Sequence, residues 1–272
     1  MLNRKFNEVF ALASLLLAGA LPLPGALAQP LDPEQPTVLI TGSNRGIGYA
    51  FAEHYASLGW NVIATTRSPD EATELAALAH KHDRVRIEKL DVTDYAAIEA
   101  LAAAYAGTAI DVLINNAGIY GERERQAWGS LDPELFSEIN AVNVLGPLKM
   151  AEAFEEHVAA SRQKKIISIT SGAGSVSPDR VAGGGVFYGI SKAALNMAMR
   201  KARAEVADRG IIVATIAPGL VLTDMLQTSR PSLAPRATTA KESVARMAAV
   251  IESLDQSYDG QPRNYDGSVL PW

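Results

Sequence analysis

Residues 38–48 read VLITGSNRGIG, a short apolar run that leads into a loop with three glycines. Beyond the loop, apolar side chains recur near helical spacing at Ile47, Ala50, Phe51, Tyr55 and Leu58. In such a strand–loop–helix unit, the first glycine permits a tight turn, the second lets the backbone approach a pyrophosphate, and the third lets the helix pack close to the sheet. The free N–H groups at the helix N-terminus face the phosphate. The stretch therefore predicts a βα unit that binds a nucleotide.

The rest of the chain alternates strands with helices and contains no internal repeat. Apolar runs predict strands at residues 38–40, 61–66, 85–92, 111–114, 165–170, 211–217 and 264–265. Helical patterns are predicted over residues 47–58, 93–105, 132–159, 188–208 and 240–254. This alternation is typical of a parallel sheet with helices on both faces. We expect an α/β fold, a single doubly wound domain over residues 36–272 with a parallel sheet of about seven strands.

Two helix starts carry recognisable capping residues. Ser68, Pro69 and Glu71 stand where a capping box places its N-cap, N1 and N3 residues, so a further helix is expected to begin there. Asp132 followed by Pro133 gives a similar signal for the long helix that reaches about residue 159.

The first 28 residues differ in character from the rest of the chain. Arg4 and Lys5 precede a 13-residue apolar run over residues 9–21, and the small residues Ala26 and Ala28 suit a signal peptidase. The run is shorter than the ~20 residues that a membrane-spanning helix needs. We expect a signal peptide over residues 1–28, export to the periplasm or the medium after cleavage near Ala28, and no stable membrane span thereafter. If the N-terminus is not processed, the protein is cytoplasmic.

The composition excludes several classes of protein. Hydrophobic residues make up 48% of the chain and charged residues 20%, so it can bury a sizeable core. A net charge of −5 without a long basic run argues against nonspecific nucleic-acid binding. The absence of cysteine excludes disulfides and cysteine-ligated metals, and the four histidines form no metal-binding motif. We expect no nucleic-acid partner and no metal site.

A second constellation lies on a predicted helix, where Tyr188 and Lys192 are four residues apart. Side chains at this spacing share one helical face, so an ammonium group can lie beside a phenol. A neighbouring positive charge favours the phenolate and lowers the pKa of tyrosine from its usual ~10. The pair could therefore serve as a general acid and base, although an isolated pair of this kind also occurs on ordinary surface helices.

From about Thr37 to its C-terminus, the chain resembles the short-chain dehydrogenase/reductase family, whose members have a Rossmann fold. The resemblance is carried, in chain order, by Thr41-Gly42-x-x-x-Gly46-x-Gly48, Asn115-Asn116-Ala117-Gly118 and Tyr188-x-x-x-Lys192. It implies an enzyme whose catalytic residues are Asn143, Ser171, Tyr188 and Lys192. It also implies a cofactor site formed by Gly42, Asn44, Arg45, Gly46, Ile47, Gly48, Arg67, Asp91, Val92, Asn116, Ala117, Gly118, Tyr188, Lys192, Pro218, Gly219 and Thr223.

The resemblance further implies a mechanism in which hydride passes between a nicotinamide and a carbonyl or secondary alcohol. Ser171 would polarise the carbonyl and Tyr188 would act as general acid or base. Lys192 would lower the Tyr188 pKa and hold the ribose, while Asn143 would position a water. Asn143 has a second interpretation, as a polar residue that kinks a helix made weak by the Gly146-Pro147 pair that follows it.

Ser175 competes with Ser171 for the serine role, because the interval between Ser171 and Tyr188 is longer than is common in the family. Ser171 is preferred because it is nearer the strand end, where open α/β sheets bind ligands. The C-terminal residues 264–272 also resemble the ending of the C-factor-like branch of the family, whose substrates are poorly settled.

The predicted cofactor is NADP(H), preferred over NAD(H). NAD sites place an acidic residue near the end of the second strand, whereas this strand ends in Thr66-Arg67. Arg45 in the glycine loop offers a second cation, and arginine pairs well with a 2′-phosphate.

Residues 119–131 and 220–236 are expected to form the substrate walls, which favours an apolar aldehyde or ketone as the small-molecule substrate. As a family-level expectation, the protein is a homodimer or homotetramer. The alternative to an enzyme is a non-catalytic dinucleotide-binding or signalling protein on the same fold.

Overall fold

The computed structural model describes residues 31–179 and 185–271. Leu31–Trp272 form one compact unit. The expected signal peptide, residues 1–28, lies outside the described residues. In the part of the chain that is described, no helix is long and apolar enough to cross a membrane.

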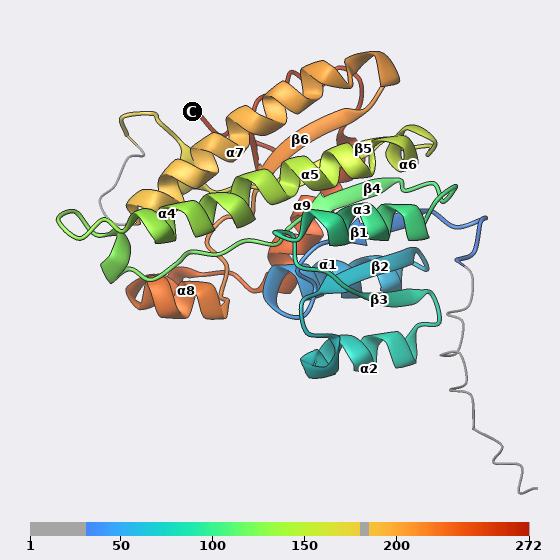
Figure 1. Cartoon of the computed structure of the whole chain (residues 1–272), viewed down its shortest axis with the longest axis horizontal. Helices are drawn as coiled ribbons and strands as arrows, with labels where there is room; N and C mark the ends of the chain where they lie inside the picture. Colours follow the sequence, from blue (N-terminus) through green and yellow to red (C-terminus); the bar gives the residue numbers. More distant parts are fainter. Residues whose placement is uncertain (1–30, 180–184, 272) are drawn as a thin grey trace, which may run out of the picture. The chain divides into compact units, whose positions relative to one another are not determined.

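A parallel sheet forms the centre of this unit (Figure 1). Within the described residues it has seven strands in the order β3-β2-β1-β4-β5-β6-β7, and every neighbouring pair is parallel. The strands are β1 (Thr37–Ile40), β2 (Asn61–Thr66), β3 (Val85–Lys89), β4 (Val112–Asn115), β5 (Lys165–Ile169), β6 (Ile212–Ala217) and β7 (Arg263–Asn264). The strand order reverses between β1 and β4, the position at which doubly wound sheets bind ligands. The predicted fold class is confirmed.

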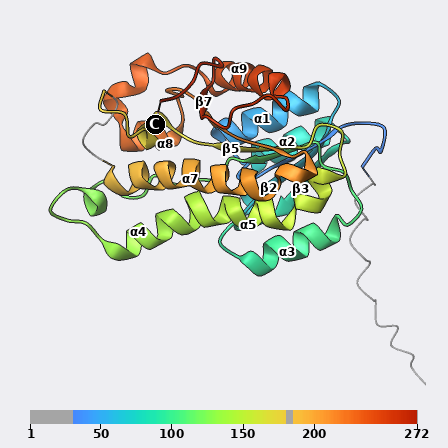
Figure 2. The ribbon, with the colours of Figure 1, turned by 90° about the horizontal axis from the view of Figure 1, so that it is seen from above.

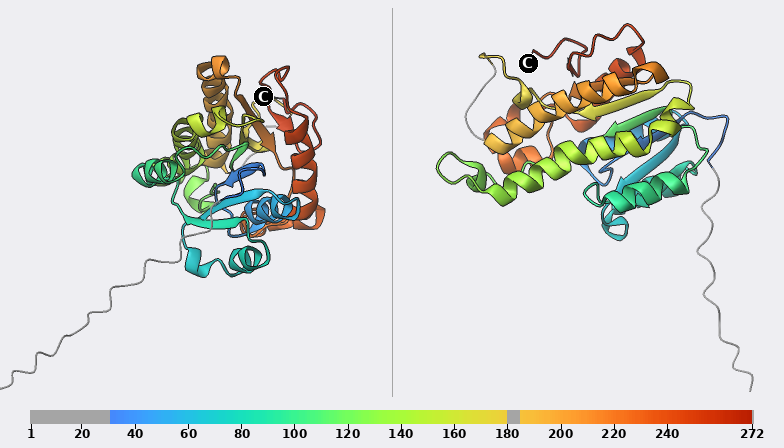
Figure 3. Two further views of the ribbon diagram at one scale, coloured as in Figure 1. Left: turned by 90° about the vertical axis from the view of Figure 1, so that its right-hand side faces the viewer. Right: turned by 45° about the horizontal axis from the view of Figure 1, so that its top comes forward.

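Helices cover both faces of the sheet, as Figures 2 and 3 show. One face packs against α1 (Gly46–Ser57), α2 (Thr73–Lys81) and α9 (Ala240–Ser253). The other packs against α3 (Tyr95–Ala104), α5 (Gly146–Ala153) and α7 (Val186–Glu205). The remaining α-helices of the described part are α4 (Pro133–Asn140), α6 (Glu155–Ala159) and α8 (Asp224–Ser229). Short helical turns are η1 (Pro69–Glu71), η2 (Glu124–Gln126), η4 (Gly172–Gly174), η5 (Ala207–Arg209) and η6 (Pro231–Arg236), and η3 (Ala141–Leu145) is a π-helix.

The side chains of β1 explain this two-sided packing. Val38 and Ile40 belong to the core cluster under α1 and α9, whereas Leu39 belongs to the cluster under α5 and α7. Successive side chains of a strand point to opposite faces, and all three of these are fully buried. An uninterrupted apolar strand is therefore what a sheet covered on both faces requires.

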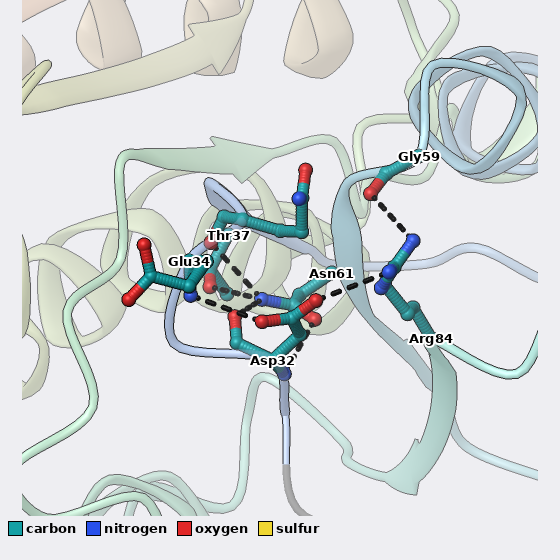
Figure 4. Close-up of polar contacts among 7 residues, drawn as sticks. Asp32, Glu34, Thr37, Gly59, Asn61 and Arg84 are labelled. Atoms are coloured by element: carbon teal, nitrogen blue, oxygen red, sulfur yellow. Dashed lines mark hydrogen bonds and ion pairs between the residues drawn. The ribbon is translucent and has the colours of Figure 1, made fainter.

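A polar network fastens the segment before β1 to the start of β2 (Figure 4). The Asn61 amide nitrogen donates to the backbone oxygens of Asp32 at 2.8 Å and Gln35 at 3.1 Å, and its oxygen accepts from the Asp32 N–H. Arg84 forms an ion pair with Asp32 at 3.0 Å and donates to the Gly59 carbonyl. Because Asn61 is the first residue of β2, this network lies at the amino-terminal ends of the strands, opposite their carboxyl ends.

The predicted capping box at Ser68 is wrong. The Ser68 side chain makes no capping hydrogen bond, and the residues after it form only the short turn η1. Ala72 then adopts a non-helical conformation (φ −84°, ψ 61°) and is buried, so α2 begins at Thr73 instead.

The predicted long helix over residues 132–159 begins as expected but is not continuous. The Asp132 carboxylate accepts a hydrogen bond from the Glu134 N–H at 2.8 Å, which confirms the cap. The helix then passes through the π-helical turn η3 before α5, and Phe154 separates α5 from α6. A π-helical turn shifts the hydrogen-bond register of a helix and is frequent at functional sites.

Candidate active site

An open cleft of about 2390 Å³ lies at the carboxyl ends of the central strands. It is lined by the loops that follow β1, β4, β5 and β6. Of the site residues expected from the sequence, all line this cleft except Asn143. Residues from seven separate stretches of the chain, between Gly42 and Thr223, therefore meet in one place.

The glycine loop is held against the segment after β4. A Cβ atom on Gly48 would lie 2.1 Å from the Gly42 carbonyl oxygen and 2.5 Å from the Asn116 amide nitrogen. Gly42 itself has a left-handed backbone (φ 67°), and a Cβ there would lie 3.0 Å from the Ala117 Cα. A side chain at Gly48 would therefore force the backbone to shift, and one at Gly42 would combine a tight contact with a strained backbone.

Asn116 has a structural task besides lining the cleft. Its amide nitrogen donates to the carbonyl oxygens of Thr41 at 2.9 Å and Gly42 at 3.0 Å. The Thr41 hydroxyl in turn accepts from the backbone N–H groups of Asn116 and Ala117, both at 3.0 Å. These bonds fix the loop after β4 and the glycine loop to each other.

The N-terminus of α1 opens into the cleft without a polar cap. Its N-cap residue, Arg45, makes no side-chain capping bond, and the first turn of the helix holds no acidic residue. The N–H groups of a first helical turn need external acceptors, and the helix dipole there favours an anion. The glycine loop, residues 42–48, and the uncapped N-terminus of α1 together form a cradle that fits the pyrophosphate of a dinucleotide.

Two arginines predicted to recognise a 2′-phosphate differ in their surroundings. Arg45 forms an ion pair with Asp224 at 3.2 Å, in which both side chains are 68% exposed, so it is weakly held. Arg67 lies near Asp91, whose pKa burial alone would raise. Hydrogen bonds from the Thr93 backbone and hydroxyl, together with the Arg67 charge, instead leave the Asp91 pKa below its usual value.

Tyr188 and Ser171 face each other in the cleft. Tyr188 lies in the first turns of α7, and Ser171 follows β5 and caps η4, its hydroxyl accepting from the Ala173 N–H at 3.2 Å. Burial raises the pKa of Tyr188, while Ser171 and the positive charge of Arg230 lower it by smaller amounts. The net effect is a raised pKa, so the phenol stays protonated at neutral pH.

Lys192 lies one helical turn beyond Tyr188, as the spacing predicts. Its Nζ donates to the Ile169 carbonyl at 2.9 Å and is 5.8 Å from the centre of the Tyr188 ring. Burial lowers the pKa of Lys192 to about 8. The groups that shift the Tyr188 pKa are its burial, Ser171, Tyr120 and Arg230, and the net shift is upward, so the lowering by Lys192 stays a prediction.

Asn143 does not reach the cleft. It is fully buried in the π-helical turn η3, where its amide exchanges two hydrogen bonds of 2.9 Å with the backbone of Ile119 and donates a third to the Ser191 hydroxyl. These bonds occupy the amide, so its side chain is not free to hold a water in the cleft. Asn143 is instead a positioning residue that joins the loop after β4 to α7.

The choice between Ser171 and Ser175 is supported by their hydrogen bonds. The Ser175 hydroxyl donates to the Pro271 carbonyl at 2.5 Å and accepts from the Ser177 N–H at 3.3 Å. Ser175 therefore ties the C-terminal segment to the loop after η4. Ser171 is the serine that faces Tyr188.

The segment after β6 approaches the glycine loop from the other side. Thr223 caps α8 by accepting from the Leu226 N–H, and its methyl group would lie 3.4 Å from a Cβ on Gly46. Gly219 has a left-handed backbone (φ 77°), and a Cβ there would strike the Tyr265 ring at 2.6 Å. The cleft is thus bounded by residues 218–223 on this side.

The sequence places residues 119–131 in the substrate walls but does not reveal two contacts that they make with α7. The Tyr120 ring packs against the Tyr188 ring with centres 4.8 Å apart. Gln126, fully buried, donates to the Tyr120 carbonyl at 2.7 Å and accepts from the Tyr188 N–H at 3.1 Å. Gln126 thereby caps α7 from a position 62 residues earlier in the chain. A single glutamine in a predicted loop gives no signal of such a task.

Comparisons with known proteins agree with this geometry. A family model described as short chain dehydrogenase matches residues 36–234. An uncharacterized oxidoreductase of Schizosaccharomyces pombe is 32% identical over 247 residues, which cover 86% of this chain and 96% of that protein. The C-signal protein of Myxococcus xanthus is 34% identical over 60% of this chain and 93% of its own length.

A solved structure also matches. The NADPH-bound carbonyl reductase from chicken fatty liver superimposes with a TM-score of 0.80 at 34% identity, covering 88% of this chain and 99% of that one. The C-signal match lends the resemblance to the C-factor-like branch only loose support, because it covers less of the chain. On the family model and the full-length matches, this chain belongs to the short-chain dehydrogenase/reductase family of oxidoreductases.

Proposed function

We propose that this protein is an NADP(H)-dependent carbonyl reductase in which Tyr188 is the general acid. The observation that carries the proposal is the pairing of Ser171 with Tyr188 at the cleft, beside a cradle that fits a dinucleotide. The structural similarity to an NADPH-bound carbonyl reductase supports it.

Each residue of the site has a definite task in this reaction. The Ser171 hydroxyl holds the substrate carbonyl oxygen, and Tyr188 donates its phenolic proton to that oxygen as negative charge develops. The reduced nicotinamide supplies the hydride when it is bound. Lys192 donates one N–H to the Ile169 carbonyl and has two further donors, which suit the hydroxyl groups of a ribose.

The raised pKa of Tyr188 keeps the phenol in the protonated form that reduction needs. Reduction needs a protonated phenol, and burial keeps the proton on Tyr188 at neutral pH. Alcohol oxidation needs the phenolate, which burial disfavours, so oxidation calls for a more alkaline solution. A panel of aldehydes and ketones with NADPH, followed at the nicotinamide absorbance, tests the proposal. Turnover of none of them would argue for the non-catalytic alternative.

The proposed preference for NADP(H) rests on Arg67 and on the lack of an acidic residue at Thr66. Thr66 is buried at the end of β2, and Arg67 follows it at the wall of the cleft. Arg45, on the facing loop, must leave its exposed ion pair with Asp224 to contribute, which costs little because such pairs are worth about 0 to 1 kcal/mol. A charge-assisted hydrogen bond to a 2′-phosphate contributes ~1.5 to 3 kcal/mol and has no counterpart in NAD(H).

Thr66→Asp combined with Arg67→Leu should reverse the cofactor preference. The wild type is expected to bind NADPH at least tenfold more tightly than NADH, because ~1.4 kcal/mol corresponds to a factor of ten. The double variant places a carboxylate where NADH offers a hydroxyl and NADPH a repelled phosphate. Fluorescence titration of both cofactors measures the effect. A wild type that binds the two cofactors equally would reject the assignment of Arg67.

We also propose that the protein forms a dimer through α4 and α7, which lie side by side in Figures 1 and 2. Large apolar side chains are exposed along these helices and the adjoining π-helical turn, namely Phe136, Leu145, Ile190 and Met197. Exposed apolar side chains grouped on one face are typical of a protein interface. Light scattering should give twice the chain mass or a larger even multiple, and Ile190→Glu should yield monomers. A wild-type monomer at micromolar concentration would contradict this.

A further inference from the structure

The substrate side of the cleft has one aromatic wall and one cationic wall. Tyr120 packs against Tyr188 on the aromatic side. Arg230, half-buried, follows α8 and precedes η6, with its backbone N–H bonded to the Leu226 carbonyl at 2.8 Å. Both residues line the same cleft as Ser171 and Tyr188. Arg230 and the following Pro231 therefore place a cation on a short, constrained turn in the wall of this cleft.

Arg230 lines the cleft that also holds Tyr188, and it has no ion-pair partner among residues 31–179 and 185–271. It acts on the Tyr188 phenol, lowering its pKa against the larger opposite effect of burial. Two acidic residues of the cleft already have cationic partners, since Asp224 pairs with Arg45 and Glu122 with Arg125, both at 3.2 Å. Among the residues that the structure describes, no carboxylate forms an ion pair with Arg230. A ligand anion can therefore take that position without displacing a protein partner.

We infer that Arg230 selects substrates that carry a carboxylate a few bonds from the reacting carbonyl. This inference rests on the proposed reductase function and names its substrate class. The planar guanidinium donates two parallel N–H bonds to a carboxylate, which fixes the orientation of the substrate as well as attracting it. An oxo acid held in this way would present its carbonyl oxygen to Ser171 and Tyr188.

Exposed apolar side chains that line the cleft indicate that the rest of the substrate is apolar. Leu222 and Met225, which flank Thr223 before Arg230, are 43% and 38% exposed, and Val176, in the loop after η4, also lines the cleft and is 66% exposed. Apolar side chains at the mouth of a pocket are suited to an apolar substituent. The substrate class is therefore an oxo acid with an apolar body, which is narrower than the neutral aldehyde or ketone that the sequence favours.

Oxo acids and their methyl esters test this inference. The probes are 2-oxo-4-phenylbutanoate and 4-oxo-4-phenylbutanoate, which place the carboxylate at two distances from the carbonyl, each compared with its own ester. We expect Arg230→Gln to lower kcat/KM for at least one acid tenfold or more, mainly through KM, and to change the ester values less than twofold. Arg230→Lys should retain part of the acid activity. Comparing each acid-to-ester ratio across variants cancels the different intrinsic reactivities of the two carbonyl groups.

Lys241→Gln is the matched control, because it removes one positive charge from an exposed position on α9 that does not line the cleft. It should leave both acid and ester rates unchanged. An acid-to-ester ratio that is the same in wild type and Arg230→Gln would overturn the inference. So would equal losses for acid and ester, which would mean that Arg230 acts only on Tyr188 or on the fold.

A binding measurement separates this inference from the proposed reductase function. Calorimetric titration of 2-hydroxy-4-phenylbutanoate and 4-hydroxy-4-phenylbutanoate into the protein with NADP⁺ needs no turnover. We expect at least one of them to bind the wild type, and binding at least tenfold weaker to Arg230→Gln. Binding of this kind without reduction of any carbonyl would reject the reductase and keep the anion site. The absence of hydroxy acid binding to the wild type would reject the anion site even if neutral carbonyls are reduced.

Discussion

Tyr188→Phe is expected to lower kcat/KM for carbonyl reduction at least ~10²-fold, which is the lower end of the effect of losing a general acid. The substitution keeps the ring and its contact with Tyr120 but removes the only proton that the phenol can transfer. NADPH affinity and thermal stability should stay near those of the wild type, because the ring packing is unchanged. Steady-state rates with saturating NADPH provide the measurement.

Tyr120→Phe is the matched control for this prediction. It deletes the same hydroxyl group from the ring that packs against Tyr188, and the hydrogen bond from Gln126 to the Tyr120 carbonyl is unaffected. We expect reduction rates within a few fold of the wild type. A Tyr188→Phe variant that keeps normal turnover, or a Tyr120→Phe variant that loses as much, would remove Tyr188 from its assigned role.

Gly48→Ala should weaken NADPH binding by ~10- to 100-fold, since losing a charge-assisted hydrogen bond to the pyrophosphate costs ~1.5 to 3 kcal/mol. The new methyl group would lie 2.1 Å from the Gly42 carbonyl oxygen, which is backbone and cannot rotate away. Either α1 or the glycine loop must shift, so the uncapped N–H groups of the helix no longer face the same point. Overpacking of this kind also costs ~1 to 3 kcal/mol of unfolding free energy.

Gly107→Ala separates the effect on the cofactor from general destabilisation. Gly107 has a left-handed backbone (φ 80°) with no atom within 4 Å of its Cβ position, so alanine there brings only backbone strain of ~1 to 2 kcal/mol. Fluorescence titration should show normal NADPH affinity for Gly107→Ala and weak affinity for Gly48→Ala. Equal affinities in the two variants would mean that the close approach at Gly48 has no part in shaping the cofactor site.

The parts of the site that follow strand ends could be predicted from the sequence. Gly42, Asn116 and Ser171 follow three strands in register, so their meeting at one edge is a consequence of a parallel sheet. The pairing of Tyr188 with Lys192 could also be predicted, because helical spacing alone puts the two residues on one face.

Other features depend on tertiary contacts that a sequence pattern does not encode. The burial of Asn143 follows from its bonds to Ile119, which is 24 positions away in the chain. The raised pKa of Tyr188 depends on how much of the chain covers the phenol, which spacing cannot reveal. Ser68 failed as a cap for a related reason, since the buried Ala72 breaks the helix after one turn.

The two hydrogen bonds of the Gln126 side chain limit how loops of this protein can be exchanged to alter its substrate specificity. Gln126 joins the loop after β4 to the first turn of α7, so the two segments cannot be exchanged as independent modules. A graft that omits Gln126 leaves the Tyr188 N–H without its acceptor, so α7 can fray at that turn. Chimeras should therefore include both Gln126 and Tyr120. Slow amide hydrogen exchange at Tyr188 would report that its N–H is bonded to Gln126.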